Sequence, residues 1–188
     1  MNIQFHIMCL LLFMCAGGCI KSGDESEVNH PAQVDPLSNL KEQSRRMLNA
    51  GIRGDDEKFA DYIVPTLIQK VGGRQRLIEG AKTMRDDLKR RGFRMVGFRF
   101  SSSPRIRTSG DVMFAVVPYV SEMTGPNGRS GTNPTALIGI SKDKGKTWRF
   151  SRAIGDDPKT LQEIMPGFPA DLPIPKKERA TWSKPKSR

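Results

Sequence analysis

Residues 74–101 have the sequence RQRLIEGAKTMRDDLKRRGFRMVGFRFS, and a change of pattern inside this stretch decides the fold class. Up to Arg91 the apolar residues recur three or four positions apart, which predicts an amphipathic helix from Arg74 to Arg91. Its apolar stripe consists of Leu77, Ile78, Ala81, Met84 and Leu88. From Phe93 to Ser101 the side chains of Val96, Phe98 and Phe100 alternate with others, which predicts a strand. Gly92 separates the two patterns and suits the left-handed end of a helix.

The sequence before this stretch predicts further helices. Asp35-Pro36 begins a helix that ends at Gly51, with an apolar side formed by Leu37, Leu40, Met47 and Leu48. Asp55 suits the N-cap of a second helical segment, and Pro65 begins a short helix that ends at Gly72-Gly73.

The sequence after it predicts strands at 105–108, 112–123, 135–141 and 148–153. Pro118 lies within the longest of these, which indicates a bulge or a sheet edge. A short helix from Pro158, capped by Asp157, and an extended proline-rich strap at 166–175 follow. Helices followed by antiparallel strands predict an α+β fold in which N-terminal helices pack on a curved antiparallel β-sheet.

This order of elements, with Gly54-Asp55-Asp56-Glu57-Lys58-Phe59-Ala60 and Gly72-Gly73, resembles the nuclear-transport-factor-2-like superfamily, also called the cystatin-like cone. The resemblance extends from about Pro36 to Ala153. It implies a sheet that curls around a long helix and leaves a cone-shaped pocket. The superfamily includes dehydratases, steroid isomerases, peptidoglycan-associated domains and many non-enzymatic binding domains.

The N-terminus contains an apolar run, Ile7 to Ala16, followed by Gly17-Gly18-Cys19. The run is too short to span a bilayer and is typical of an export signal. Its end resembles the bacterial lipoprotein signal, the lipobox, with Ala16 where leucine is usual. The resemblance implies cleavage of a signal peptide, residues 1–18, and lipidation of Cys19, for example by palmitate. Ile20 after the cysteine favours the outer membrane; the alternative is an ordinary cleavage site and a secreted, soluble protein.

The remaining chain divides into three parts by composition. We expect a lipidated cysteine and flexible tether at 19–35, a single α+β domain at 36–175, and a basic disordered tail at 176–188. The tail has six basic residues and one acidic residue, and the whole chain of 188 residues has a net charge of +11. A second concentration, from Lys82 to Arg107, has nine basic residues.

The positive charge points to anionic partners in the envelope. We expect membrane attachment through the lipid, a contact of the basic tail with anionic lipid or lipopolysaccharide phosphates, and no nucleic acid, for which no motif is present. The alternative is that these charges are solvated faces. Arg94 and Arg99 lie an odd number of residues apart, so a regular strand places them on opposite faces; only a bulge would bring them together.

The composition of the domain excludes several chemistries. Both histidines, His6 and His30, and all three cysteines precede residue 36. A Ser-His-Asp triad, a Cys-His pair, a histidine or cysteine zinc site and a disulfide are therefore excluded from the domain. We expect no metal and no cofactor, since no phosphate-binding or dinucleotide-binding pattern is present.

Two functions remain open for the domain. The first is non-catalytic binding of a ligand or partner of unknown specificity. The alternative is a small lyase or isomerase in which Tyr62 or Tyr119 acts with a carboxylate. The candidate carboxylates are Asp61, Asp111 and Glu122.

Residues 141–148, SKDKGKTW, match the Asp-box pattern S-x-D-x-G-x-T-W. We expect Asp143 to accept hydrogen bonds from turn amides, Gly145 to adopt positive φ and Trp148 to pack beneath the hairpin. The Asp box recurs in each blade of sialidase propellers. A single copy in a chain too short for a propeller indicates a structural turn and not a glycosidase.

Overall fold

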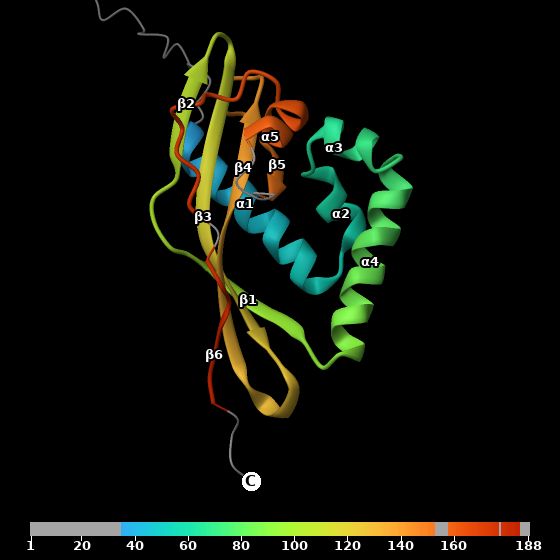
Figure 1. Cartoon of the computed structure of the whole chain (residues 1–188). Coiled ribbons are helices and arrows are strands. Elements are labelled where there is room, and N and C mark those ends of the chain that lie inside the picture. The colour runs from blue at the N-terminus through green and yellow to red at the C-terminus, as the bar shows by residue number, and fades with distance from the viewer. Residues whose placement is uncertain (1–34, 153–157, 177, 185–188) are drawn as a thin grey trace, which may run out of the picture. The chain divides into compact units, whose positions relative to one another are not determined.

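A computed structural model describes residues 35–152, 158–176 and 178–184 (Figure 1). The predicted signal peptide, Cys19, nearly all of the tether and the Asp157 cap lie outside these residues. The described chain is an α+β fold, as predicted. Its helices are α1 (Pro36–Arg53), α2 (Asp56–Asp61), α3 (Pro65–Lys70), α4 (Arg74–Arg90), α5 (Pro158–Ile164) and the short 3-10 helix η1 (Pro126–Gly128). Its strands are β1 (Arg94–Phe100), β2 (Arg105–Ser109), β3 (Val112–Thr124), β4 (Ser130–Ser141), β5 (Arg149–Arg152) and β6 (Thr181–Trp182).

The strands form one antiparallel sheet around a long central hairpin. β3 pairs with β4 without a register shift, from Met113 opposite Ser141 to Thr124 opposite Ser130. On the other side of β3, β2 pairs with its first half and β1 with its second half. On the other side of β4, β5 and β6 pair with different parts of the strand.

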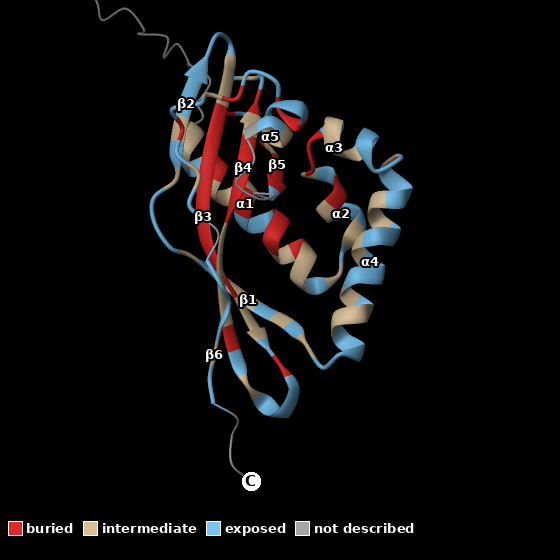
Figure 2. Ribbon diagram, in the orientation of Figure 1, coloured by how far each residue is buried: buried red, intermediate tan, exposed pale blue. Residues whose placement is uncertain are grey.

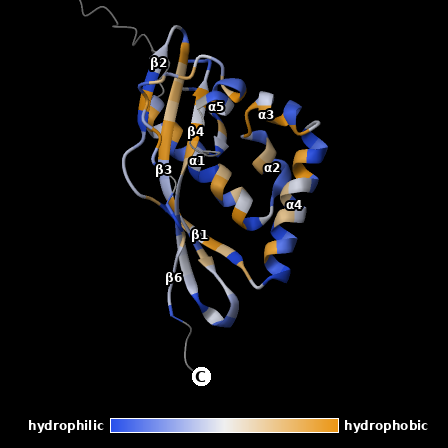
Figure 3. Cartoon of the chain, in the orientation of Figure 1, coloured by the Kyte–Doolittle hydropathy of each residue, from blue (hydrophilic) through white to orange (hydrophobic). Residues whose placement is uncertain are grey.

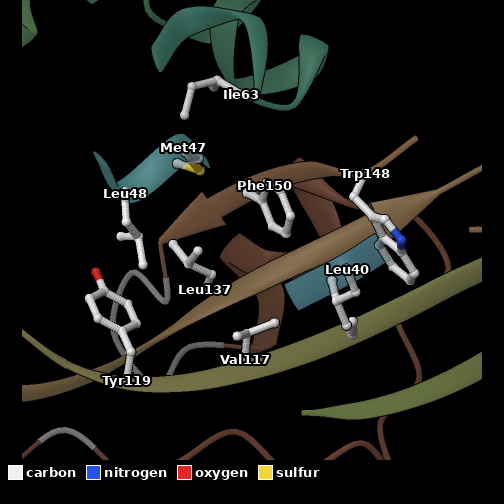
Figure 4. Close-up of a cluster of buried hydrophobic side chains, with 10 residues drawn as sticks. Leu40, Met47, Leu48, Ile63, Val117, Tyr119, Leu137, Trp148 and Phe150 are labelled. Atoms are coloured by element: carbon white, nitrogen blue, oxygen red, sulfur yellow. The ribbon is translucent and has the colours of Figure 1, made fainter. Parts of the chain in front are cut away.

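The two faces of β3 are buried by different segments. Ala115, Val117 and Tyr119 face α1 on what we call the inner face, where they join Leu40, Met47, Leu48, Ile63, Leu137, Trp148 and Phe150 (Figure 4). Phe114 and Val116 face the opposite way, on the outer face, and join residues of α5 and the strap: Ile164, Met165, Phe168 and Leu172. This alternation follows from the period of two in a strand. Figure 2 shows the resulting continuous burial of β3 and the adjoining part of β4.

The helix that packs on the sheet is α1. Its N-cap, Asp35, accepts hydrogen bonds from the amides of Leu37 and Ser38, both at 3.1 Å. A hydrogen bond from the Ser38 side chain makes the largest contribution to lowering the pKa of Asp35, and the two amide hydrogen bonds lower it further. Gly54 ends the helix with φ of +76°, a conformation that glycine adopts without strain.

The position of α4 differs from the expected apolar packing. None of its residues is fully buried, and Met84 of the predicted stripe is 61% exposed. Figure 3 shows hydrophilic residues along most of the helix. Leu77 of the stripe packs partly buried against the inner cluster, and α4 is also held against α2, where the Arg85 guanidinium donates two hydrogen bonds to the Asp56 carboxylate, at 2.5 and 2.6 Å. The helical period identified the residues of the apolar stripe, but it did not specify how far other elements would bury them.

A β-bulge changes the first strand. The pairing of β1 with β3 shifts between Met95 and Gly97, so Val96 is an inserted residue. The prediction that Val96 shares a buried face with Phe98 and Phe100 is therefore wrong for Val96, which is 49% exposed. The two phenylalanines do pack against the inner cluster.

Pro118 lies within the central strand β3 and forms no bulge, but at this residue one side of the strand is locally a sheet edge, which is the other alternative that the sequence left open. Its pairing with Ala136 of β4 is regular. On its other side lies the gap between β1 and β2, where the Ser101 amide donates to the Pro118 carbonyl at 3.1 Å. The missing N–H of proline costs nothing there, because no strand lies opposite it.

The C-terminal segment 178–184 is not the disordered tail that we expected. Thr181 and Trp182 pair as β6 with Thr132 and Gly131 of β4. The indole of Trp182 lies against Gly131 so closely that an added Cβ would be 2.5 Å from its Cε3 atom. The charge and proline content of this segment predicted disorder, whereas the packing of Trp182 against Gly131 orders it.

Candidate binding site on the inner face of the sheet

At the end of the part of the sheet that α1 covers, the inner face carries aromatic and polar side chains from three strands. The register places Phe100, Tyr119 and Thr135 in one row across β1, β3 and β4. In the next row, Ser121 pairs with Phe98 of β1 on one side and with Asn133 of β4 on the other. The bulge at Val96 lies just before this region and leaves the phenylalanines on the inner face.

The three aromatic rings form one cluster. The ring centroids of Phe98 and Phe100 are 5.7 Å apart, and those of Phe98 and Tyr119 are 6.5 Å apart, both edge to face. Tyr119 is 3% exposed, whereas the two phenylalanines are only partly buried. In Figure 4, Tyr119 extends from β3 with its hydroxyl towards Leu48 of α1. The cluster is therefore buried at Tyr119 and partly exposed at Phe98 and Phe100, which form its apolar margin.

Two arginines act on this cluster, Arg45 at Phe100 and Arg152 at Tyr119. The Arg45 guanidinium, held by Glu42 at 2.6 Å, is 6.0 Å from the centroid of Phe100, within reach of a cation–π interaction. Arg152 lies opposite Leu137 of the inner cluster and is exposed. Burial raises the pKa of Tyr119, and the positive charge of Arg152 partly opposes this rise. The phenol is therefore neutral at physiological pH.

These groups suit non-covalent binding. A partly exposed aromatic surface contacts an apolar or aromatic body, and guanidinium groups at its edge bind a carboxylate, sulfonate or phosphate. The raised pKa of Tyr119 makes its hydroxyl a poor proton acceptor at neutral pH.

The tyrosines and carboxylates proposed for catalysis are not brought together. Asp61 pairs with Arg74 at 2.9 Å, and Glu122 is 4.0 Å from Arg99. Asp111 is exposed at the turn between β2 and β3. Tyr62 ends α2 and packs against the inner cluster. Across the described residues no hydrogen bond joins Tyr62 or Tyr119 to a carboxylate, so these residues form no acid–base pair.

The Asp-box turn has the predicted geometry. Asp143 accepts hydrogen bonds from the Thr147 amide at 2.8 Å and the Thr147 hydroxyl at 2.7 Å. Gly145 has φ of +83°, and Trp148 is fully buried. The Ser141 hydroxyl completes the turn, since it donates to Asp143 and accepts from the Gly145 amide.

The turn fastens α1 to the sheet. Asn39 donates to the carbonyls of Gly145 and Lys146, both at 2.6 Å. Gln43 donates to the Lys146 carbonyl and accepts from the Trp148 amide, both at 2.9 Å. The Asp box thus has a structural role, because it fixes α1, the helix that packs on the inner face of the sheet.

Sequence reasoning did not identify Arg45 and Arg152 as part of the site. They are more than a hundred residues apart in the sequence; Arg45 comes to the cluster through the packing of α1, and Arg152 through the pairing of β5 with β4. The alternation in β1 was a usable signal for Phe98 and Phe100, but nothing local to either arginine indicated a site.

Comparison with known proteins gives no family for the chain. A scan against models of protein families finds no match, and a search of curated proteins finds no relative of significant similarity. Among the described residues, no helix is both long and apolar enough to cross a membrane. Nor do three or more metal-binding side chains gather anywhere in that part of the chain.

Proposed function

We propose that this chain is an exported, lipid-anchored protein of a bacterial cell envelope whose α+β domain binds a ligand or partner without catalysis. The apolar run before Cys19 and its resemblance to the lipobox support export and attachment. The outer membrane is the favoured location, and a secreted, soluble protein is the alternative.

The observation that carries the binding function is the partly exposed aromatic cluster with two arginines acting on it. Phe98 and Phe100 provide apolar contact, and Arg45 and Arg152 provide positive charge. The ligand class that fits is an amphipathic anion with an apolar or aromatic body. The packing of α1 on the inner face supports the proposed nuclear-transport-factor-2-like relationship, with α1 as the long helix.

Binding of 1-anilinonaphthalene-8-sulfonate, an anionic aromatic probe, tests this site. In fluorescence titrations of the full chain carrying Cys19→Ala, we expect Arg152→Gln and Phe98→Leu each to weaken binding by roughly threefold to tenfold, because they remove a charge or an aromatic contact. Val96→Ala, on the same strand but outside the cluster, is the matched control and should leave the affinity unchanged.

Thermal unfolding of each variant separates loss of the site from loss of the fold. If both site variants unfold like the parent chain and bind the probe with the parent affinity, the inner-face site is wrong. Equal weakening by Val96→Ala would also refute it.

A further inference from the structure

Four arginines follow one edge of the sheet on a single face. In the antiparallel ladder, residues directly opposite each other lie on the same face. The four β3 residues that pair with arginines are separated by even numbers of positions, so they share a face too. These pairs are Arg94 with Thr124, Arg99 with Val120, Arg105 with Val116 and Arg107 with Phe114. We call these four arginines the arginine edge.

The bulge at Val96 creates this alignment. Arg94 and Arg99 are five residues apart and would lie on opposite faces of a regular strand. The inserted Val96 shifts the register by one residue between them. Both then lie on the outer face, away from α1, so the expectation that they point in opposite directions is corrected.

Two ion pairs agree with the placement of Arg99 and Arg107 on the outer face. Arg107 is 3.4 Å from Asp171, which belongs to the strap that covers the outer cluster. Arg99 is 4.0 Å from Glu122, which occupies the outer face of β3. All four guanidinium-bearing residues are exposed, and within the described chain Arg94 and Arg105 have no ion pair.

The length of the arginine edge exceeds that of a small ligand. The β3 partners of Arg99 and Arg107 are six positions apart, which corresponds to about 20 Å at the rise of a strand. Including Arg94 extends the row to roughly 33 Å along β3. A partner that engages the whole row must present several anionic groups.

The backbone of this edge is poorly suited to pairing with another strand. A bulge at Val96 and a break with Pro104 between β1 and β2 interrupt it, and such features protect edges from strand addition. Recognition must therefore use the side chains. Guanidinium groups bind phosphate with two parallel hydrogen bonds.

We infer that the arginine edge docks the domain on the phosphate groups of an anionic lipid bilayer. The contact is separate from the inner-face site, is made by the folded domain and not by the basic tail, and does not require acylation of Cys19. It would fix which face of the domain is turned towards the membrane.

Vesicle partitioning of the full chain carrying Cys19→Ala tests this inference. Partition coefficients are measured for vesicles of phosphatidylcholine alone and for equal parts of phosphatidylcholine and phosphatidylglycerol. Their ratio isolates the electrostatic contribution, since the apolar N-terminal run contributes to both. Replacing Arg99, Arg105 and Arg107 by Gln should lower this ratio by roughly fivefold per arginine, or roughly 100-fold together, at low salt.

A matched triple variant removes the same charge elsewhere. Arg76, Lys82 and Lys89 are exposed on α4; their replacement by Gln should change the ratio less than about threefold, because charges remote from the bilayer are screened. Replacing the three edge arginines by Lys should retain most of the binding. Thermal unfolding confirms that each variant is folded.

Three results would overturn the inference. Equal losses in the two Gln triples would show that net charge alone drives binding. An unchanged ratio in the edge triple would show that these arginines do not contact lipid. If the edge triple lost binding to poly-glutamate but kept its vesicle ratio, the partner would be an acidic protein segment.

Discussion

At the scale of single residues, Asp143 holds the turn that fastens α1 to the sheet. Burial alone would raise its pKa, but hydrogen bonds from Thr147 and Ser141 outweigh this effect and lower the pKa below the ordinary value. A carboxylate with a lowered folded-state pKa stabilises the fold fully above its unfolded pKa. That contribution is lost as the pH falls through the folded pKa.

Asp143→Asn should therefore lower the free energy of unfolding by about 1–3 kcal/mol at neutral pH, since Asn cannot accept both hydrogen bonds as a charged group. The difference from the parent chain should begin to narrow below roughly pH 4, where the carboxyl of the unfolded chain becomes protonated, and should be lost as the pH falls through the lower folded-state pKa. Urea unfolding at neutral and acidic pH measures both effects.

Asp111→Asn makes the same charge change at an exposed position and should alter stability by less than about 0.5 kcal/mol. A pH-independent difference for Asp143→Asn would mean that its charge does not support the turn.

The residue scale also shows what sequence can specify. The Asp box was predictable because its hydrogen-bonding partners lie within eight consecutive residues, 141–148. The bulge at Val96 was not, because alternation of apolar residues carries no sign of an inserted residue. That one insertion decides both the exposure of Val96 and the common face of Arg94 and Arg99.

At the scale of elements, β6 depends on side-chain fit more than on strand pairing, since it has only two residues. Trp182 lies against Gly131 and Gly125, its ring centroid is 5.4 Å from that of Phe93, and the Arg129 guanidinium is 5.9 Å from its ring centroid. This contact joins the C-terminal segment to the tip of the β3–β4 hairpin.

Gly131→Ala should dislodge Trp182, because the new methyl group would overlap the indole. We expect a loss of about 1–3 kcal/mol in unfolding free energy and a red shift of the Trp182 emission, while buried Trp148 is unaffected. Gly80→Ala, in α4 with nothing within 4 Å of the added methyl, is the control and should stabilise the helix by about 0.5–1 kcal/mol. Unchanged tryptophan emission in Gly131→Ala would contradict the described packing of Trp182 against Gly131.

Element order was predictable from periodicity and from glycine and proline positions, whereas the partners of the elements were not. α1 and α4 have similar helical patterns, yet only α1 contributes fully buried residues to the inner cluster. The difference comes from long-range contacts, such as those of Asn39 and Gln43 with the Asp-box turn. The candidate site was only half predictable for the same reason, since Arg45 and Arg152 reach it through tertiary structure.

At the scale of the whole molecule, the proposal combines a lipid anchor, an inner-face binding site and an arginine edge on the outer face. The inner and outer faces are separated by the sheet, so a domain docked through the arginine edge would keep its inner-face site away from the membrane. The proposed anchor would determine where both surfaces act, and it would depend on one residue, Cys19.

Acylation of Cys19 is the most direct test of the central claim. The full chain and its Cys19→Ala variant are expressed in a bacterium supplied with labelled palmitate, and the protein in the membrane fraction is analysed by intact mass. The proposal predicts a labelled protein that begins at Cys19 and carries acyl chains, and no label in Cys19→Ala. Equal labelling of the two proteins, or none in either, would contradict the lipid-anchored account.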